Sequence, residues 1–214
     1  KERIAIIGAG IQGVCSALFL QKKGFNVTLF DRDEPGNAAS YGNAGHFSPY
    51  ASLQLNRTDI LSDIPAMLLS SRGPLALKWN YIPKMIPWFT KFIFNSSKSK
   101  MMHTAKYMHQ ILNLSLDAFD ELFQDIELGN LVVSNGIIYV WEKKGIKSRN
   151  LEINIRRELG IKQQILTPKE IHDLEPNIKP FYHGGVLYEY ARHARNPKKI
   201  LIKLFESFLG NGGK

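Results

Sequence analysis

The stretch Ile4-Ala5-Ile6-Ile7-Gly8-Ala9-Gly10-Ile11-Gln12-Gly13 stands near the start of the chain and decides the fold. An apolar run that ends at a glycine is typical of a strand buried on both faces. Apolar residues at helical spacing then continue to Lys23, Gly24 supplies a C-terminal cap, and residues 27–30 form a second apolar run. Strand, helix and parallel strand within about 30 residues predict a βαβ unit.

The glycines of this stretch match the dinucleotide-binding pattern G-x-G-x-x-G. The first glycine permits a tight turn, the second lets backbone approach a pyrophosphate, and the third lets helix and strand pack closely. The helix would point its free N–H groups at the phosphates. The predicted cofactor-binding residues of this unit are Gly8, Ala9, Gly10, Ile11, Gln12, Gly13, Asp31 and Arg32.

Asp31 follows the second predicted strand, 18 residues after Gly13. An acid about 20 residues after the glycines binds the ribose hydroxyls in such units. Its carboxylate would repel the 2′-phosphate of NADP, so we predict NAD or FAD. We interpret Arg32 as a solvated or phosphate-side charge. A glycine-rich turn followed by a chance aspartate is the alternative.

Composition limits the class of protein. The 214 residues are 44% hydrophobic and 22% charged, which is ordinary for one large or two small globular domains. The only cysteine, Cys15, leaves no internal disulfide framework and no cysteine metal cluster, so we predict no metal site and a reducing compartment. No apolar run reaches the roughly 18 residues of a membrane span. We therefore expect a soluble, unexported, cytoplasmic protein.

The net charge of +9 comes from scattered lysines. No zinc-finger spacing or other nucleic-acid motif accompanies them, so we expect a solvated basic surface and no nucleic-acid partner. A basic module that binds nucleic acid or a membrane ranks last among the alternatives, and the sequence does not indicate an oligomeric state.

Further elements follow from local patterns. Thr167, Pro168 and Glu170 form a helix start with a capping box. Ser134-Asn135-Gly136 predicts a tight hairpin turn between residues 131–133 and 136–141. The other expected elements are a loop over 34–49, short proline-punctuated helices over 60–95, helices over 103–123, 147–159 and 197–209, and a strand over 184–190.

The loop Ala39-Ser40-Tyr41-Gly42-Asn43-Ala44-Gly45-His46-Phe47-Ser48-Pro49 resembles the D-amino-acid oxidase superfamily of FAD-dependent oxidoreductases, and within it the bacterial D-amino-acid dehydrogenases. The resemblance rests on the glycine fingerprint, Asp31, Ser40, Asn43-Ala44-Gly45 and Ser48-Pro49. It extends more weakly over nearly the whole chain, through Pro74-Leu75, Trp88, Gly136 and Gly184-Gly185.

The resemblance implies FAD as the cofactor. Ser40 would contact the pyrophosphate, while Asn43, Ala44 and Gly45 would run beside the flavin, where small residues avoid a clash with the flat ring. His46 would lie at the flavin edge, where it could tune the flavin or touch substrate; it is the one catalytic candidate. A loop histidine without a chemical role, and a flexible connector, are the alternatives.

The implied reaction is oxidation of the C–N bond of an amino acid or amine, in class EC 1.4. The α-hydrogen leaves as hydride to flavin N5, and the resulting imine is hydrolysed to a keto acid. Electrons would pass to a membrane acceptor, so residues 64–94 could contact the inner membrane peripherally; we favour buried substrate-domain helices there. An NAD-dependent dehydrogenase and an FAD-binding fragment without turnover are the alternatives.

The expected fold is α/β: a Rossmann-like FAD/NAD(P)-binding βαβ domain with a mixed α+β substrate domain inserted. The first FAD-binding segment spans 1–50, the substrate domain portion 51–194 and a return helix 195–214. Arg192, His193 and Arg195 replace an acidic corner of the family and could bind a substrate carboxylate, with surface charge as the alternative. The family continues beyond Lys214, so we expect a truncated chain.

Overall fold

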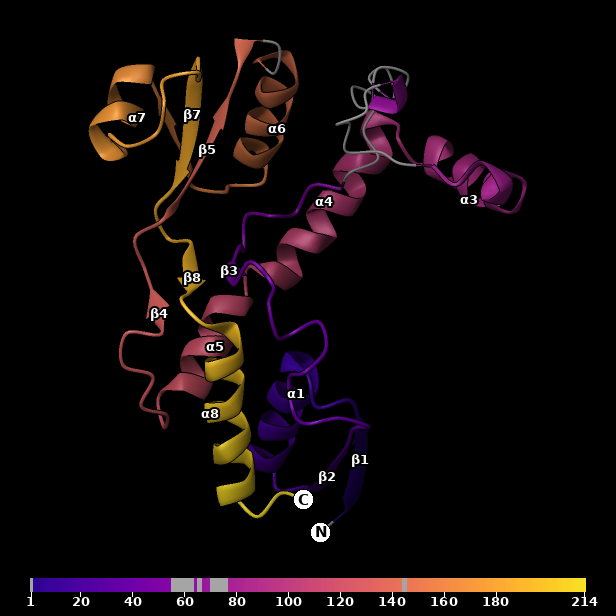
Figure 1. Ribbon diagram of the computed structural model, residues 1–214, viewed down its shortest axis with the longest axis vertical. Helices are drawn as coiled ribbons and strands as arrows, with labels where there is room; N and C mark the ends of the chain where they lie inside the picture. The colour runs from indigo at the N-terminus through magenta and orange to yellow at the C-terminus, as the bar shows by residue number, and fades with distance from the viewer. Residues whose placement is uncertain (1, 55–63, 65–66, 70–76, 144–145) are drawn as a thin grey trace. The chain divides into compact units, whose positions relative to one another are not determined.

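The computed structural model describes residues 2–54, 64, 67–69, 77–143 and 146–214, and it has two compact units (Figure 1). Unit 1 comprises Lys1–Pro49, Leu114–Ile137 and Glu189–Lys214, and unit 2 comprises Tyr50–Asn113 and Ile138–Tyr188. Residues 114–137 and 189–194 thus group with the βαβ segment, although the expected substrate portion spans 51–194. The functions assigned to these segments stay predictions.

Unit 1 begins with the predicted βαβ unit. Strand β1 (Arg3–Ile7) leads through helix α1 (Ile11–Lys22) to strand β2 (Asn26–Phe30), and the two strands pair in parallel with Ile4 opposite Val27. Gly24 turns the chain out of α1 with a φ of +88°. Burial of β1 on both faces is not found: Ile7 is 92% exposed, because among the described residues only the opposite face is packed.

Helix α8 (Pro197–Gly210) packs on α1 and completes this core. The helix begins as predicted at Pro197, and the Asn196 side chain caps it by accepting a hydrogen bond from Lys199 N at 2.9 Å. Lys214 then pairs with β2, donating to Val27 O and accepting from Leu29 N. The buried core residues are Val14, Ala17, Leu18, Val27, Leu122, Ile200, Leu201, Leu204 and Phe208.

A second small sheet in unit 1 shows that the predicted hairpin is wrong. Strand β8 (Arg192–Ala194) lies between β3 (His46–Phe47) and β4 (Val132–Val133), antiparallel to both. Strand β5 (Ile137–Trp141) joins the sheet of unit 2 instead. Gly136 does turn with a φ of +78°, but its N–H binds Ala191 O, so the chain passes from one sheet to the next rather than folding back.

The single helix predicted over 103–123 is also wrong. Helix α4 (Lys98–Leu112) ends before Asn113, and helix α5 (Ser115–Phe123) follows. Helix α4 buries Met101 and Ala105 in unit 2, whereas α5 buries Leu122 in the core of unit 1. Two segments that bury their apolar sides in different cores do not continue as one helix.

Unit 2 contains a sheet in the order β5, β7 (Gly184–Tyr188) and β6 (Gln164–Leu166). Helices α6 (Ile146–Glu158) and α7 (Pro168–Leu174) lie on opposite sides of it (Figure 1). The predicted capping box of α7 is confirmed, since Thr167 and Glu170 bind each other's backbone N–H groups.

Short proline-punctuated helices were predicted over 60–95, and this stretch contains the 3-10 turn η1 (Trp79–Tyr81) and helix α3 (Ile82–Phe94). Helix α3 continues through Pro87, and none of its residues is buried as the expected substrate-domain helices would be. The rest of the stretch lies largely outside the described residues. Across the described residues, we find no helix with the length and apolarity of a membrane span.

Candidate functional site

The glycine fingerprint forms a tight turn between β1 and α1. Gly8 has a φ of +109° and donates from its N–H to Phe30 O at 2.7 Å. A Cβ on Gly13 would lie 1.8 Å from Gly8 O, so helix and turn approach more closely than any side chain permits. The backbone around Gly10 is more open, since a Cβ there would meet only the Ser40 hydroxyl, at 3.3 Å.

The Asp31 carboxylate lies against this turn. Its Oδ2 accepts a hydrogen bond from Ala9 N at 2.7 Å, and its Oδ1 accepts one from Asp33 N at 3.1 Å. These bonds, the one from Ala9 foremost, hold the pKa of Asp31 below its ordinary value. The group is therefore ionised at neutral pH, and because a carboxylate offers about four acceptor positions, it can still accept bonds from hydroxyls of a ligand.

Ser40 contacts the glycine fingerprint at the N-terminus of α1. Gly10 occupies the N-cap position without a side-chain cap of its own, and the Ser40 Oγ accepts a hydrogen bond from Ile11 N at 3.0 Å. The remaining N–H groups of the first turn have no acceptor within the helix, and the helix dipole is positive there. This end of α1 can therefore bind a phosphate.

These groups line a cavity of about 480 Å³ in unit 1. Among the predicted residues, those that line it are Gly8, Gly10, Ile11, Gln12, Asp31, Ser40 and Asn43. Arg32 does not; its side chain is exposed and forms an ion pair with Asp33 at 3.3 Å. Its predicted phosphate-side role stays a prediction.

The other wall of the cavity is formed by Asp33 and the first part of the expected loop over 34–49, a role that was not predicted for these residues. Its residues there are Asp33, Glu34, Gly36, Asn37, Ala38 and Ala39. Gly36 closes the loop by donating to Ala9 O at 3.1 Å, in a conformation with φ of +77°, and Asn37 accepts a bond from Lys198 of α8 at 2.7 Å. The turn signal Pro35-Gly36 could have located this wall.

The predicted flavin loop is held at its end by strand pairing. The Asn43 side chain accepts a hydrogen bond from Gly45 N at 2.8 Å. Gly45 has a φ of +65°, and its carbonyl oxygen accepts a 2.7 Å hydrogen bond from Ala194 N. A Cβ on Gly45 would lie 2.8 Å from Ala194 O. Ala44 and Gly45 do not line the cavity, and His46, opposite His193 in the β3–β8 pair, is exposed.

Helix α5 anchors this small sheet. Both terminal nitrogens of Arg192 donate to the Asp120 carboxylate, with Nη2 2.9 Å from Oδ2. The bond holds the pKa of Asp120 below its ordinary value. The Phe47 ring packs edge-on against Phe119, with centroids 4.8 Å apart. Arg192 thus joins β8 to α5, which disfavours the hypothesis that it binds a substrate carboxylate.

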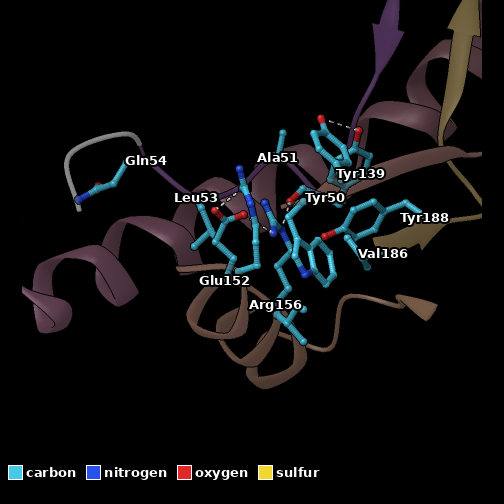
Figure 2. Close-up of a pocket in the computed structure, with 12 residues that line it drawn as sticks. Tyr50, Ala51, Leu53, Gln54, Tyr139, Glu152, Arg156, Val186 and Tyr188 are labelled. Atoms are coloured by element: carbon cyan, nitrogen blue, oxygen red, sulfur yellow. Dashed lines mark hydrogen bonds and ion pairs between the residues drawn. The ribbon is translucent and has the colours of Figure 1, made fainter. Parts of the chain in front are cut away.

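Unit 2 contains a separate cavity of about 280 Å³ (Figure 2). Glu152 is buried on α6 and binds both Arg149, at 2.6 Å, and Arg156, at 2.9 Å. Arg156 also donates to Tyr50 O, and the Tyr50 ring stacks on Tyr188 with centroids 3.9 Å apart. Because both guanidinium groups are engaged by Glu152, we assign this cluster to holding Tyr50 against α6 and β7.

Comparison with known proteins identifies the family. Residues 3–214 match the family described as "DAO: FAD dependent oxidoreductase". The D-amino-acid oxidase of Bradyrhizobium diazoefficiens is 32% identical over 216 residues, and the D-amino acid dehydrogenase of Helicobacter pylori is 23% identical over 219. The alignments cover 100% of this chain, and 51% and 50% of those two proteins. The chain thus spans about half the length of these curated relatives.

Solved structures show the same fold. Glycine oxidase from Geobacillus kaustophilus superposes with a TM-score of 0.63 at 18% identity, over 100% of this chain and 46% of that one. L-amino acid deaminase from Proteus vulgaris gives 0.60 at 10%, over 100% and 38%. With the family match extending over nearly the whole sequence, the chain belongs to the DAO family of FAD-dependent oxidoreductases.

Proposed function

We propose that this chain holds FAD and contributes to oxidation of the C–N bond of an amino acid or amine. One observation carries the proposal: Gly10, Asp31 and Ser40 line a single cavity at the N-terminus of α1. The family is FAD-dependent, which favours FAD over the alternative of an NAD-dependent dehydrogenase. The relative at 32% identity is named D-amino-acid oxidase, which favours an amino acid as the substrate.

The residues present fit the adenosine diphosphate part of FAD. The open backbone at Gly10 leaves room for a diphosphate against the first turn of α1, where N–H groups and the helix dipole offset its negative charge. Ionised Asp31 can accept bonds from the ribose hydroxyls. The Ser40 hydroxyl accepts from Ile11 N and can donate its own proton to a phosphate oxygen.

The loop from Asn43 to His46 would then run beside the flavin ring. Its two small residues allow a flat ring to approach the backbone, and the pairing of β3 with β8 fixes where the loop ends. The exposed imidazole of His46 is available to contact the ring or the substrate. Ala194 packs against Gly45 and would hold the backbone of this loop in place for the ring.

FAD, when bound, supplies the redox chemistry by accepting the substrate α-hydrogen as hydride at N5. The amine nitrogen loses a proton to solvent as it forms a double bond to Cα, and water hydrolyses this imine to a keto acid with loss of ammonia. The chain's own residues would bind and orient the cofactor: the N-terminus of α1 would hold the diphosphate, Asp31 the ribose and the loop from Asn43 the ring. This reaction places the activity in class EC 1.4.

The test is anaerobic titration of the FAD-loaded chain with D-alanine, proline, sarcosine and glycine, followed at visible wavelengths. We expect the flavin absorbance to bleach with at least one of these amines. Bound FAD that no amine or D-amino acid reduces would favour the alternative of an FAD-binding protein without turnover. A chain that binds NAD and not FAD would overturn the proposal.

A further inference from the structure

One lysine of helix α8 contacts the loop that carries Ser40 on both sides of this serine. The Lys198 Nζ donates a hydrogen bond to Asn37 Oδ1 at 2.7 Å, and it lies over the Tyr41 ring, 4.9 Å from the ring centroid. Asn37 precedes Ser40 by three residues and Tyr41 follows it directly. All of these residues belong to unit 1, so a single side chain ties α8 to the wall of the cavity.

The same side of α8 also packs against the start of this loop. Leu201 follows Lys198 by three residues, so the two side chains lie on one side of the helix. Gly36 approaches this side so closely that a Cβ on it would lie 3.0 Å from Cδ2 of Leu201. The Gly36 N–H in turn donates to Ala9 O in the glycine turn. Residues 36–41 are therefore held between α8 and the glycine fingerprint.

The place of Lys198 in its helix indicates a specific contact rather than a solvated charge. Lys198 lies in the first turn of α8, where the positive end of the helix dipole disfavours a cation. Its side chain is half-buried, whereas the neighbouring Lys199 is exposed. The hydrogen bond to Asn37 and the contact with the Tyr41 ring offset the unfavourable position.

Ser40 is the residue of this loop whose position matters most for a ligand. Its Oγ accepts a hydrogen bond from Ile11 N at 3.0 Å, and a Cβ on Gly10 would lie 3.3 Å from the same oxygen. A displacement of the loop by about 1 Å would take this bond out of hydrogen-bonding range. The hydroxyl would then neither accept from Ile11 nor reach a phosphate oxygen at the N-terminus of α1.

We propose that Lys198 is a positioning residue for the cofactor. Through Asn37 and Tyr41 it fixes the loop, so that the Ser40 hydroxyl stays at the N-terminus of α1. Lys198 does not itself line the cavity, so it acts through the loop and not by contact with the ligand. This inference rests on the proposed function and assigns part of it to a helix whose residues lie far from the fingerprint in the sequence.

Hydrogen exchange tests the positioning without FAD, so its failure is distinct from a failure of the proposed function. Ile11 N lies in the first turn of α1, where no helix carbonyl accepts its proton, so its protection depends on Ser40. Lys198→Met keeps the aliphatic part of the side chain and removes the donor. In this variant we expect the Ile11 amide, followed by NMR, to exchange at least about tenfold faster.

The matched control for exchange is Lys199→Met, which removes the same charge from the adjacent, exposed position. It should change the exchange rate of the Ile11 amide less than about twofold. Equal exchange in the wild type and Lys198→Met, or equal acceleration in the two variants, would overturn the proposal.

FAD titration measures the consequence for the cofactor. Lys198→Met is expected to weaken FAD binding about tenfold, and Lys199→Met to leave it unchanged. Lys198→Arg can still donate to Asn37 and lie over the Tyr41 ring, so it should restore the affinity to within about threefold of the wild type. We expect all three variants to keep the wild-type urea midpoint. A lower midpoint of Lys198→Met with unchanged FAD affinity would show a purely structural role and contradict the proposal.

A double-mutant cycle shows whether Lys198 acts through Ser40. Ser40→Ala removes the hydroxyl that contacts Ile11 N. If Lys198 positions that hydroxyl, Lys198→Met should weaken FAD binding less than about threefold once residue 40 is alanine. A further loss of about tenfold in the double variant would show that Lys198 acts on the cofactor independently of Ser40, and the positioning role would be wrong.

Discussion

The Asp31 carboxylate accepts a hydrogen bond from the backbone N–H of Ala9, with 2.7 Å between Oδ2 and nitrogen. This bond ties the end of β2 to the glycine turn that follows β1, so one side chain links the two halves of the βαβ unit. It also keeps the carboxylate ionised and directed at the cavity where the proposed ribose would lie. The same residue therefore shapes the turn and supplies its charge.

The glycines at 10 and 13 are expected to respond differently to one added methyl group. Gly13→Ala places a Cβ 1.8 Å from Gly8 O and should unfold unit 1 or lower its stability by more than about 3 kcal/mol. Gly10→Ala meets only the Ser40 hydroxyl and should keep the fold while weakening FAD binding about tenfold or more. Thermal unfolding and FAD titration of both variants check this; equal stability losses would contradict it.

Gly45 is predicted to be required for the pairing of β3 with β8. Gly45→Ala forces a side chain into a φ of +65° and against Ala194 O, and should destabilise the chain by about 1–3 kcal/mol. Gly42 is the matched control, because its φ is not in the left-handed region and a Cβ there has open space. Urea unfolding should show Gly42→Ala within about 0.5 kcal/mol of the wild type. Equal effects of the two changes would contradict the geometry of the loop.

The ion pair between Asp120 and Arg192 predicts a pH dependence of stability. Because the folded-state pKa of Asp120 is lowered, its contribution is complete above the unfolded value of about 3.9 and is lost as the pH falls through the folded value. Asp120→Asn should therefore destabilise by about 1 kcal/mol at pH 7, since the pair is partly exposed.

The difference between Asp120→Asn and the wild type should shrink below about pH 3.9. Urea unfolding at pH 7 and pH 3 measures it, and the exposed Asp173→Asn serves as the control. A difference that is the same at both pH values would show that Asp120 acts through packing rather than through its charge.

The sequence predicted the βαβ unit and the capping box of α7 because both depend on residues close in the chain. Gly8, Gly10 and Gly13 specify a turn whose geometry is local, and Thr167 with Glu170 closes a single helical turn. Asp31 was predicted by its spacing, and the structure brings it to the turn as expected.

Elements that depend on distant partners were not predictable in this way. The Asn135-Gly136 pair indicates a turn, but only β8, some 60 residues later, determines which sheet each flanking strand joins. The apolar residues of α3 have the same composition whether they face a core or a solvent-exposed surface. The cavity wall formed by residues 33–39 depends on the hydrogen bond from Gly36 N to Ala9 O. No rule of sequence spacing predicts this contact.

We propose that Asp31 and the N-terminus of α1 hold FAD, and equilibrium titration of the chain with FAD is the direct test of this claim. We expect the wild-type chain to bind FAD and turn yellow, and Asp31→Ala to weaken this binding on the order of 10- to 100-fold. Asp173→Ala, which removes the same charge from an exposed site on unit 2, should leave the affinity unchanged. An Asp31→Ala chain that binds FAD as tightly as the wild type would contradict the claim.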